Sequence, residues 1–296
     1  MSDSTKTVLV TGASGLLGME LTNQLMQDGV HVKALYHKHP IVATNPLMTT
    51  ICCDLLDVVA LEEVMEGVTE VYHCAGLISY VPNQRDALYK INAEATANVV
   101  NACIEHGVVR LVFTSSMAVY GIGKPPFKES DIPAPIDPYG VAKYACEMDI
   151  QIAGEQHGLD WCIIRPHNVY GRNQNIWDRY RNVLGIWMYQ NINGMPFTIF
   201  GDGSQQRAFS CIDDCLLPLW KAGTDARASK QIINIGSWKY YTIKEAAEVL
   251  KSVIGNGEVK HEEARHEVKD ALPSHELSVQ LLDYKDNTSL QAGLTD

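Results

Sequence analysis

The sequence predicts an α/β fold in which a doubly wound parallel sheet carries a smaller C-terminal α+β region. Short runs of β-branched residues alternate with stretches of helical period, a glycine cluster follows the first run, and the pattern becomes irregular after about residue 169. The 296 residues, 46% of them hydrophobic, are enough for one large core with an appendage.

Seven apolar runs are the predicted strands: Thr7–Thr11, His31–Tyr36, Thr50–Asp54, Glu70–Cys74, Arg110–Ser115, Trp161–Arg165 and Gln231–Ile235. Helical patterns fill the gaps between them, most clearly at Gly15–Gln27, Arg85–His106, Tyr139–His157, Arg179–Asn193 and Ile243–Val253. Strands that alternate with helices form βαβ units, so we expect parallel pairing.

The regular alternation predicts where the chain divides. Residues 1–168 are expected to form the nucleotide domain, with returning elements near 208–237, and residues 169–296 a substrate-binding region. Neither a linker nor a repeat separates the two parts, so we expect them to share one core.

Charge and hydropathy exclude several classes of protein. The 24 lysines and arginines against 35 aspartates and glutamates leave a net charge of −11, which disfavours binding to nucleic acid or to an anionic membrane. The sequence has neither an apolar run of membrane-spanning length nor the apolar segment of a signal peptide, so we expect a soluble, cytoplasmic protein.

The eight cysteines are expected to be buried free thiols, because most of them lie inside apolar runs. Cys211 and Cys215 flank two aspartates, but no histidine or cysteine pair at zinc spacing accompanies them. We therefore expect no metal site.

A glycine pattern predicts a dinucleotide site. Gly12, Gly15 and Gly18 follow the first strand and open the first helix, so the backbone can approach a pyrophosphate whose charge meets the helix N-terminal amides. In this context the pattern is typical of a Rossmann-type fold. A glycine-rich turn without a ligand is the alternative.

Three polar residues predict an active site. Tyr139 and Lys143 lie one turn apart in a predicted helix, where the lysine ammonium favours the phenolate form of an otherwise poor base. Ser116, at the end of the fifth strand, can bond a substrate oxygen during hydride transfer. Alternatively, Ser115 and Ser116 cap the strand exit.

Together these elements resemble the Ser–Tyr–Lys site of extended short-chain dehydrogenase/reductases, in particular their nucleotide-sugar epimerase/dehydratase branch. The resemblance covers nearly the whole chain, and it implies a nicotinamide cofactor, NAD. The residues that it implies in cofactor binding are Gly12, Ser14, Gly15, Leu16, Leu17, Tyr36, His37, Lys38, Asp54, Leu55, Ala75, Gly76, Asn92, Tyr139, Lys143 and Pro166.

The resemblance also implies a nucleotide-sugar substrate, a UDP-sugar first of all. Its contacts are expected from Ser116, Tyr139, Asn168, Arg207 and Arg265. In an acidic protein a diphosphate needs local positive charge, and a guanidinium provides bidentate contacts. For Arg207, an ion pair with Asp213 or Asp214 is the alternative.

The residues after Ser116 indicate which reaction of this branch is expected. Dehydratases of the branch carry an Asp-Glu pair at this point, because loss of water needs a second acid and base. Here Met117 and Ala118 occupy these positions. We therefore expect inversion of C4 of a UDP-hexose, between UDP-glucose and UDP-galactose, through a transient 4-keto sugar.

One departure from the pattern keeps a second function open. NAD-binding proteins usually carry an acid after the second strand, and here Tyr36 takes its place. Lys33, His37 and Lys38 could instead bind the 2′-phosphate of NADP. This pattern of residues resembles that of the NADP-dependent carbonyl reductases related to dihydroflavonol and cinnamoyl-CoA reductases. The same charges could also be solvated loop residues. A binding protein without activity is disfavoured, because Ser116, Tyr139 and Lys143 are all present.

Assembly and chain length are expectations from the resemblance. In the family, the helices predicted at Arg85–His106 and Tyr139–His157 pair with a second subunit in a four-helix interface, so we expect a homodimer; packing on the chain's own sheet is the alternative. The segment 288–294 resembles the start of the family's last helix, so we expect a chain truncated within it.

Overall fold

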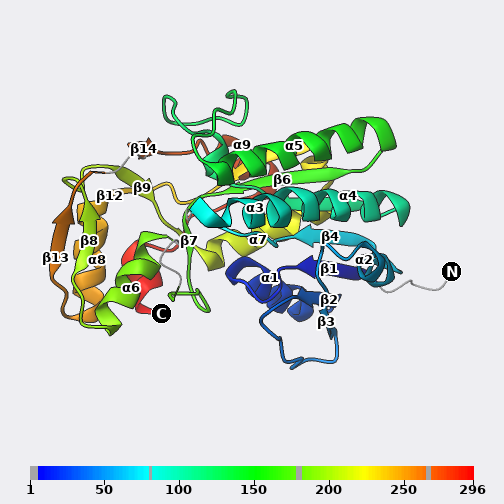
Figure 1. The fold of residues 1–296 in the computed structure, drawn as a ribbon, viewed down its shortest axis with the longest axis horizontal. Helices are drawn as coiled ribbons and strands as arrows, with labels where there is room; N and C mark the ends of the chain where they lie inside the picture. The colour runs from blue at the N-terminus through cyan, green and yellow to red at the C-terminus, as the bar shows by residue number, and fades with distance from the viewer. Residues whose placement is uncertain (1–5, 80–81, 178–181, 265–267) are drawn as a thin grey trace.

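The computed structural model describes residues 6–79, 82–177, 182–264 and 268–296. A seven-stranded sheet lies at its centre, with the order β11-β6-β5-β4-β1-β2-β3 (Figure 1). The strands of this sheet are β1 Thr7–Thr11, β2 His31–Tyr36, β3 Met48–Cys52, β4 Glu70–His73, β5 Arg110–Thr114, β6 Trp161–Pro166 and β11 Gln231–Ile235. All neighbouring strands are parallel, which confirms the predicted fold class.

The predicted third strand, Thr50–Asp54, was placed two residues too late. The strand ends at Cys52, which is in register with Tyr36 at the end of β2. Asp54 already belongs to a turn, because its Oδ1 accepts a hydrogen bond from the amide of Leu56 at 3.0 Å. Asp54 therefore lies beyond the carboxyl edge of the sheet.

Helices cover both faces of the sheet. One layer consists of α1 Leu16–Gln27, α7 Ile212–Thr224 and α9 Glu276–Leu282; the other consists of α2 Val58–Met65, α4 Ala95–Glu105 and α5 Pro138–His157. Alternate residues of a strand point to opposite faces, so Val8 and Val10 pack in the first layer and Leu9 packs in the second. Two apolar layers result, as a doubly wound sheet requires.

The long helix predicted at Arg85–His106 is interrupted. The short helix α3 Arg85–Tyr89 passes into a π-helical turn, Lys90–Glu94, before α4 begins. Asn92 lies within this turn and is buried. Turns of this kind often occur at functional sites, and Asn92 in this one bonds Leu77, which belongs to a loop that lines the cavity described below.

A second small core lies beyond the carboxyl edge of the sheet (Figure 1). Its strands are β7 Val169–Tyr170, β8 Phe197–Phe200, β9 Gln206–Ala208, β10 Ser210–Cys211, β12 Tyr240–Thr242, β13 Val259–Glu262 and β14 Asp270–Ala271. Its helices are α6 Val183–Ile192, α8 Ile243–Ile254 and α10 Leu290–Thr295. Asn182 caps α6, and part of the predicted helix Arg179–Asn193 lies outside the described residues.

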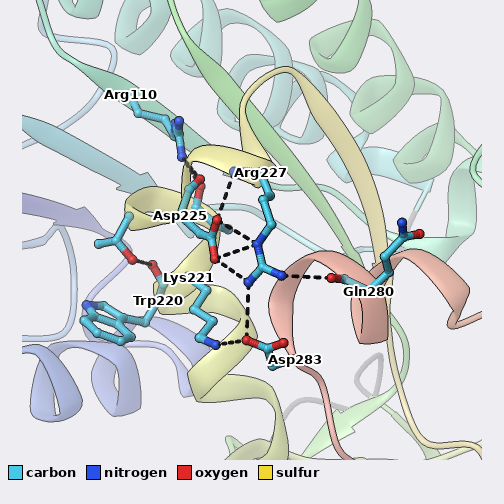
Figure 2. Close-up of polar contacts among 9 residues, drawn as sticks. Arg110, Trp220, Lys221, Asp225, Arg227, Gln280 and Asp283 are labelled. Carbon is cyan, nitrogen blue, oxygen red and sulfur yellow. Dashed lines mark hydrogen bonds and ion pairs between the residues drawn. The ribbon is translucent and has the colours of Figure 1, made fainter.

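The chain returns to the sheet twice after residue 168. Helix α7 and strand β11 complete the sheet, and α9 then packs against both of them. The return of α9 was not predicted. Figure 2 shows how polar contacts fix it: Arg227 binds Asp225 at 2.6 Å, the carbonyl oxygen of Gln280 at 3.1 Å and Asp283 at 3.3 Å.

All eight cysteines are unpaired, as expected. Cys52, however, is exposed and Cys74 is only half-buried, because both lie at or beyond the ends of their strands. No described helix is both long and apolar enough to cross a membrane.

His73 connects the sheet to α4 from a fully buried position. Its Nδ1 lies 2.6 Å from Thr11 Oγ1 and its Nε2 lies 2.9 Å from Thr96 Oγ1, two hydrogen bonds that occupy both ring nitrogens. Burial, together with the charge of Lys143, lowers the pKa of His73 to about 3. The ring is therefore neutral at pH 5 and at pH 7.

The low pKa of His73 makes stability depend on acidity. Below about pH 6.5 the unfolded chain binds a proton at this histidine and the folded chain does not, so stability falls as the pH drops towards 3. We expect the free energy of unfolding of the parent to fall between pH 7 and pH 5, and that of His73→Gln to fall by about 2 kcal/mol less. Urea unfolding at both pH values measures this difference. The exposed His39→Gln is the control and should follow the parent; equal losses in His73→Gln and the parent would contradict the assignment.

Candidate active site

A cavity of about 1540 Å³ opens at the carboxyl ends of the parallel strands and extends into the C-terminal region. Ligands of doubly wound sheets bind at this edge, next to the point where the strand order reverses, here between β1 and β4. The cavity brings together most of the predicted site residues: Gly12, Ser14, Gly15, Leu16, Leu17, Tyr36, His37, Lys38, Asp54, Leu55, Ala75, Gly76, Ser116, Tyr139, Lys143, Pro166, Asn168 and Arg207. Arg265 lies outside the described residues.

The glycine turn packs so closely on neighbouring backbone that Gly12 and Gly18 leave no space for a side chain. Gly12 has a φ of +64°, and a Cβ there would lie 2.7 Å from the backbone of Ala75. A Cβ on Gly18 would lie 2.3 Å from the carbonyl oxygen of Gly12. Among the described residues no side chain caps α1 at Gly15, so its first amides remain available to an anion. This turn fits the pyrophosphate of a dinucleotide.

At the far side of this turn the cavity is lined by the ends of β2 and β3. His37 Nε2 lies 3.8 Å from Asp54 Oδ2. Lys33, one of the three predicted phosphate contacts, does not reach this place: its Nζ donates to the carbonyl oxygens of Val64 and Glu66 at 2.9 and 2.7 Å. Lys33 sits three residues before the strand end, where its side chain points to the α2 side of the sheet.

Asn92 does not line the cavity, but it holds a loop that does. Its amide bonds both backbone groups of Leu77, with Asn92 Oδ1 accepting at 2.9 Å and Nδ2 donating at 2.7 Å. A Cβ on Gly76 would lie 3.3 Å from Lys143 Nζ, so the loop runs close to the lysine. Asn92 therefore shapes the cavity wall from behind.

Helix α5 presents Tyr139 and Lys143 to the cavity. Asp137 caps the helix by accepting from the amide of Gly140 at 2.8 Å, and Pro138 occupies the first turn. Lys143 Nζ donates to the carbonyl oxygen of Thr114 at 2.8 Å and lies 5.9 Å from the centroid of the Tyr139 ring. Burial lowers the pKa of Lys143.

Ser116 combines the two interpretations that the sequence left open. Its Oγ accepts from the amide of Ala118 at 3.1 Å, which caps a short 3-10 turn, and it also lines the cavity. Since the oxygen accepts in this bond, the hydroxyl hydrogen can be donated to a substrate oxygen. Ser116 and Tyr139 thus offer one donor and one phenol to the same space.

A buried ion pair holds these elements together. Glu147, one turn after Lys143 on α5, binds Arg165 of β6 through Nη2 at 2.6 Å and through Nε at 2.9 Å. Ser115, next to Ser116, donates its hydroxyl to the same carboxylate. Both charged side chains are almost completely buried. Helix α5, strand β6 and the end of β5 therefore meet at one carboxylate.

Asn168 and Arg207 occupy the part of the cavity towards the C-terminal region. Asn168 has a φ of +40° and donates from Nδ2 to the carbonyl oxygen of Ala208 at 3.0 Å. Arg207 Nη1 and Nη2 donate to the carbonyl oxygens of Lys269 and Val268 at 2.8 and 2.6 Å. These bonds fix the guanidinium at the wall of the cavity.

The alternative partners considered for Arg207 are engaged elsewhere. Asp213 binds Arg172 at 2.6 Å, and Asp214 accepts from the amide of Thr288 at 2.8 Å.

Several lining residues were not predicted. His167, Asn173, Gln174, Tyr189, Phe200 and Gln205 also line the cavity. His167 is buried between two predicted residues, Pro166 and Asn168, and this position was the available signal. Burial, together with the nearby charge of Arg207, lowers the pKa of His167 to about 3, so the ring stays neutral.

Comparison with known proteins agrees with this geometry. Residues 8–236 match the model of the NAD dependent epimerase/dehydratase family. The chain belongs to this family. The match spans the glycine turn, α5 and Arg207; of the described lining residues, only Ile243, Glu262, Val268 and Ala271 lie beyond it.

Individual relatives are distant from this chain. The uncharacterised UDP-glucose epimerase YtcB of Bacillus subtilis is 27% identical over 98% of this chain and 96% of its own. The uncharacterised protein y4nG of Sinorhizobium fredii is 28% identical over 89% of this chain, which spans 62% of that relative. MoeE5, solved in complex with UDP-glucuronic acid and NAD, superposes with a TM-score of 0.89 at 27% identity, over 97% of this chain and 96% of its own.

The Glu147–Arg165 pair generates a stability prediction. Glu147→Gln leaves the Arg165 charge buried without a counter-charge, which should cost about 3 kcal/mol of unfolding free energy in urea titrations. Asp149→Asn, an exposed substitution on the same helix, is the matched control and should change stability by less than about 0.5 kcal/mol. A loss below about 1 kcal/mol in Glu147→Gln would show that the pair does not hold these elements together.

Proposed function

We propose that this protein interconverts the C4 epimers of a UDP-hexose, UDP-glucose and UDP-galactose, with a bound nicotinamide cofactor, NAD. The observation that carries the proposal is the meeting of Ser116, Tyr139 and Lys143 in a cavity that also contains a dinucleotide-type glycine turn and Arg207. Family membership and the relatives named as UDP-glucose epimerases support it.

Tyr139, Lys143 and Ser116 each have a separate role in the proposed reversible oxidation. Tyr139, as phenolate, takes the proton of the C4 hydroxyl, and the ammonium of Lys143 favours that phenolate. Ser116 donates a hydrogen bond to the same oxygen as it becomes a carbonyl. The bound nicotinamide ring supplies hydride acceptance and return. Inversion follows when the 4-keto sugar presents its other face before Tyr139 gives the proton back.

Arg207 and Asn168 are suited to the diphosphate of the substrate. The guanidinium, which its bonds to backbone carbonyl oxygens hold at the cavity wall, provides local positive charge for phosphate oxygens in a protein of net charge −11. Met117 and Ala118, which follow Ser116, cannot transfer protons. Elimination of water is therefore disfavoured against simple epimerisation.

A net carbonyl reductase that uses NADPH is the second candidate, favoured by Tyr36 at the position where NAD-binding proteins carry an acid. The two functions differ in redox balance. A reductase consumes NADPH in proportion to substrate, whereas an epimerase leaves the absorbance of added NADPH unchanged.

Tyr139 should be essential for turnover. Tyr139→Phe removes the proton acceptor and should lower kcat for conversion of UDP-glucose to UDP-galactose by at least about 100-fold. Tyr144→Phe, on the same helix but not at the cavity, is the control and should keep the parent rate. Equal rates for Tyr139→Phe and the parent would contradict the mechanism.

Arg207 should act on substrate affinity. Arg207→Ala removes this positive charge from the cavity wall and should raise KM for the nucleotide sugar by about 10-fold or more, with a smaller change in kcat. Arg227→Ala, which removes an exposed guanidinium of the Figure 2 network, should leave KM unchanged. Kinetics on both variants, after thermal unfolding has shown that they fold, checks the assignment. An unchanged KM in Arg207→Ala would contradict it.

We also propose a homodimer formed through α5. Val141, Met148 and Ile152 lie on one face of this helix and are 42%, 44% and 48% exposed, which is unusual for large apolar side chains on a single helix face. Such a stripe fits an interface in which helices α4 and α5 of one subunit pack against the same two helices of a second copy.

Sedimentation at micromolar concentration should therefore give a dimer. The double substitution Met148→Glu and Ile152→Glu should give a monomer, because charges would be buried in the interface. Leu217→Glu, at a residue that is 45% exposed on α7 over the opposite face of the sheet, should remain a dimer. A parent protein that sediments as a monomer would exclude the interface.

A further inference from the structure

The cavity end formed by β2 and β3 differs chemically from a site built for NAD. In doubly wound folds an acid at the end of the second strand bonds the adenosine ribose hydroxyls of NAD, and a basic residue there accepts the 2′-phosphate of NADP. Here β2 ends at Tyr36, and the residues that follow, His37, Lys38 and His39, all line the cavity. The chain places Tyr36 where the hydroxyl-binding acid would be, and basic residues directly after it.

The nearest carboxylate does not replace that acid. Asp54 lies after β3, not β2; its Oδ1 accepts from the amide of Leu56 at 3.0 Å and its Oδ2 faces His37 Nε2 at 3.8 Å. One carboxylate oxygen of Asp54 is therefore engaged in the turn, and the other faces an imidazole. Of the other acids among the described lining residues, Asp137 caps α5 and Glu262 belongs to β13, so neither is at this end.

Lys38 is the cation that is available to a ligand. Lys33, the other lysine near this strand, is tied to two carbonyl oxygens at the end of α2. Lys38 is exposed at the rim, and within the described part of the chain its ammonium has neither a hydrogen bond nor an ion pair. In a protein of net charge −11, an uncompensated lysine beside two histidines in a ligand cavity is a local positive site.

We propose that this end of the cavity holds the 2′-phosphate of NADP, with Lys38 and His37 as its partners, so that the protein binds NADP at least as tightly as NAD. The inference rests on the proposed function, because it assumes that the cavity takes a nicotinamide dinucleotide. It leaves the reaction unchanged, since the 2′-phosphate is on the adenosine ribose, at the opposite end of the dinucleotide from the reacting ring.

Calorimetric titration of cofactor-stripped protein with NADP and with NAD tests the inference without any turnover. We expect the Kd for NADP to be equal to or below that for NAD. Lys38→Ala should raise the Kd for NADP about 10-fold and that for NAD less than about 2-fold, because the lost charge faces only the extra phosphate. Lys260→Ala, an exposed lysine on β13 that does not line the cavity, is the control and should change neither Kd.

The outcomes separate this inference from the proposed function. A Kd for NADP above that for NAD overturns the inference but not the proposed epimerase activity. The same holds if Lys38→Ala raises the Kd of both dinucleotides equally, or of neither. Failure to bind either dinucleotide overturns both the inference and the proposed function. Tyr36→Asp adds a check in the opposite sense, since a carboxylate here should shift preference towards NAD by repelling the phosphate.

Discussion

The arrangement of the active site depends on the buried ion pair between Glu147 and Arg165. Both groups are buried; the two hydrogen bonds between them and the hydroxyl of Ser115 satisfy the carboxylate, and the guanidinium carbon lies 4.6 Å from the centroid of the Tyr120 ring. The pair fixes the relative positions of α5, β5 and β6 more narrowly than apolar packing would, because hydrogen bonds are directional. A shift of α5 against β6 would leave a buried charge unpaired, and a shift of the end of β5 would remove the Ser115 hydroxyl from the carboxylate.

The reactive residues are near neighbours of this pair along the chain. Lys143 precedes Glu147 by one helical turn, Ser116 follows Ser115, and Pro166 follows Arg165. Lys143 is itself held by the carbonyl oxygen of Thr114, the residue before Ser115, so α5 is tied to the end of β5 at two levels. The neutral His73 completes this environment, because a second cation near Lys143 would oppose its charge. The positions of Ser116 and Lys143 thus depend on contacts among buried residues behind the cavity wall.

What the sequence alone can predict is set by distance along the chain. The glycine turn and the Tyr139–Lys143 pair are local patterns, in which backbone geometry fixes what lies beside what, and they were found without a structure. The partner of Glu147 is 18 residues away across two elements, and no spacing rule connects them. The direction of Lys33, the π-helical turn around Asn92 and the return of α9 likewise depend on tertiary contacts. Strand β3 was misplaced because its apolar run continues into the turn that Asp54 begins.

The central claim is that C4 is oxidised and reduced within one protein, so that the hydrogen removed from carbon is the one returned. Mass spectrometry of the product formed from UDP-glucose that carries deuterium at C4 tests this most directly. The account predicts UDP-galactose that keeps the deuterium at C4, with none released to water. Loss of the label to solvent would mean that a carbon-bound proton is abstracted by a base, and it would contradict the roles given to Tyr139 and the bound cofactor.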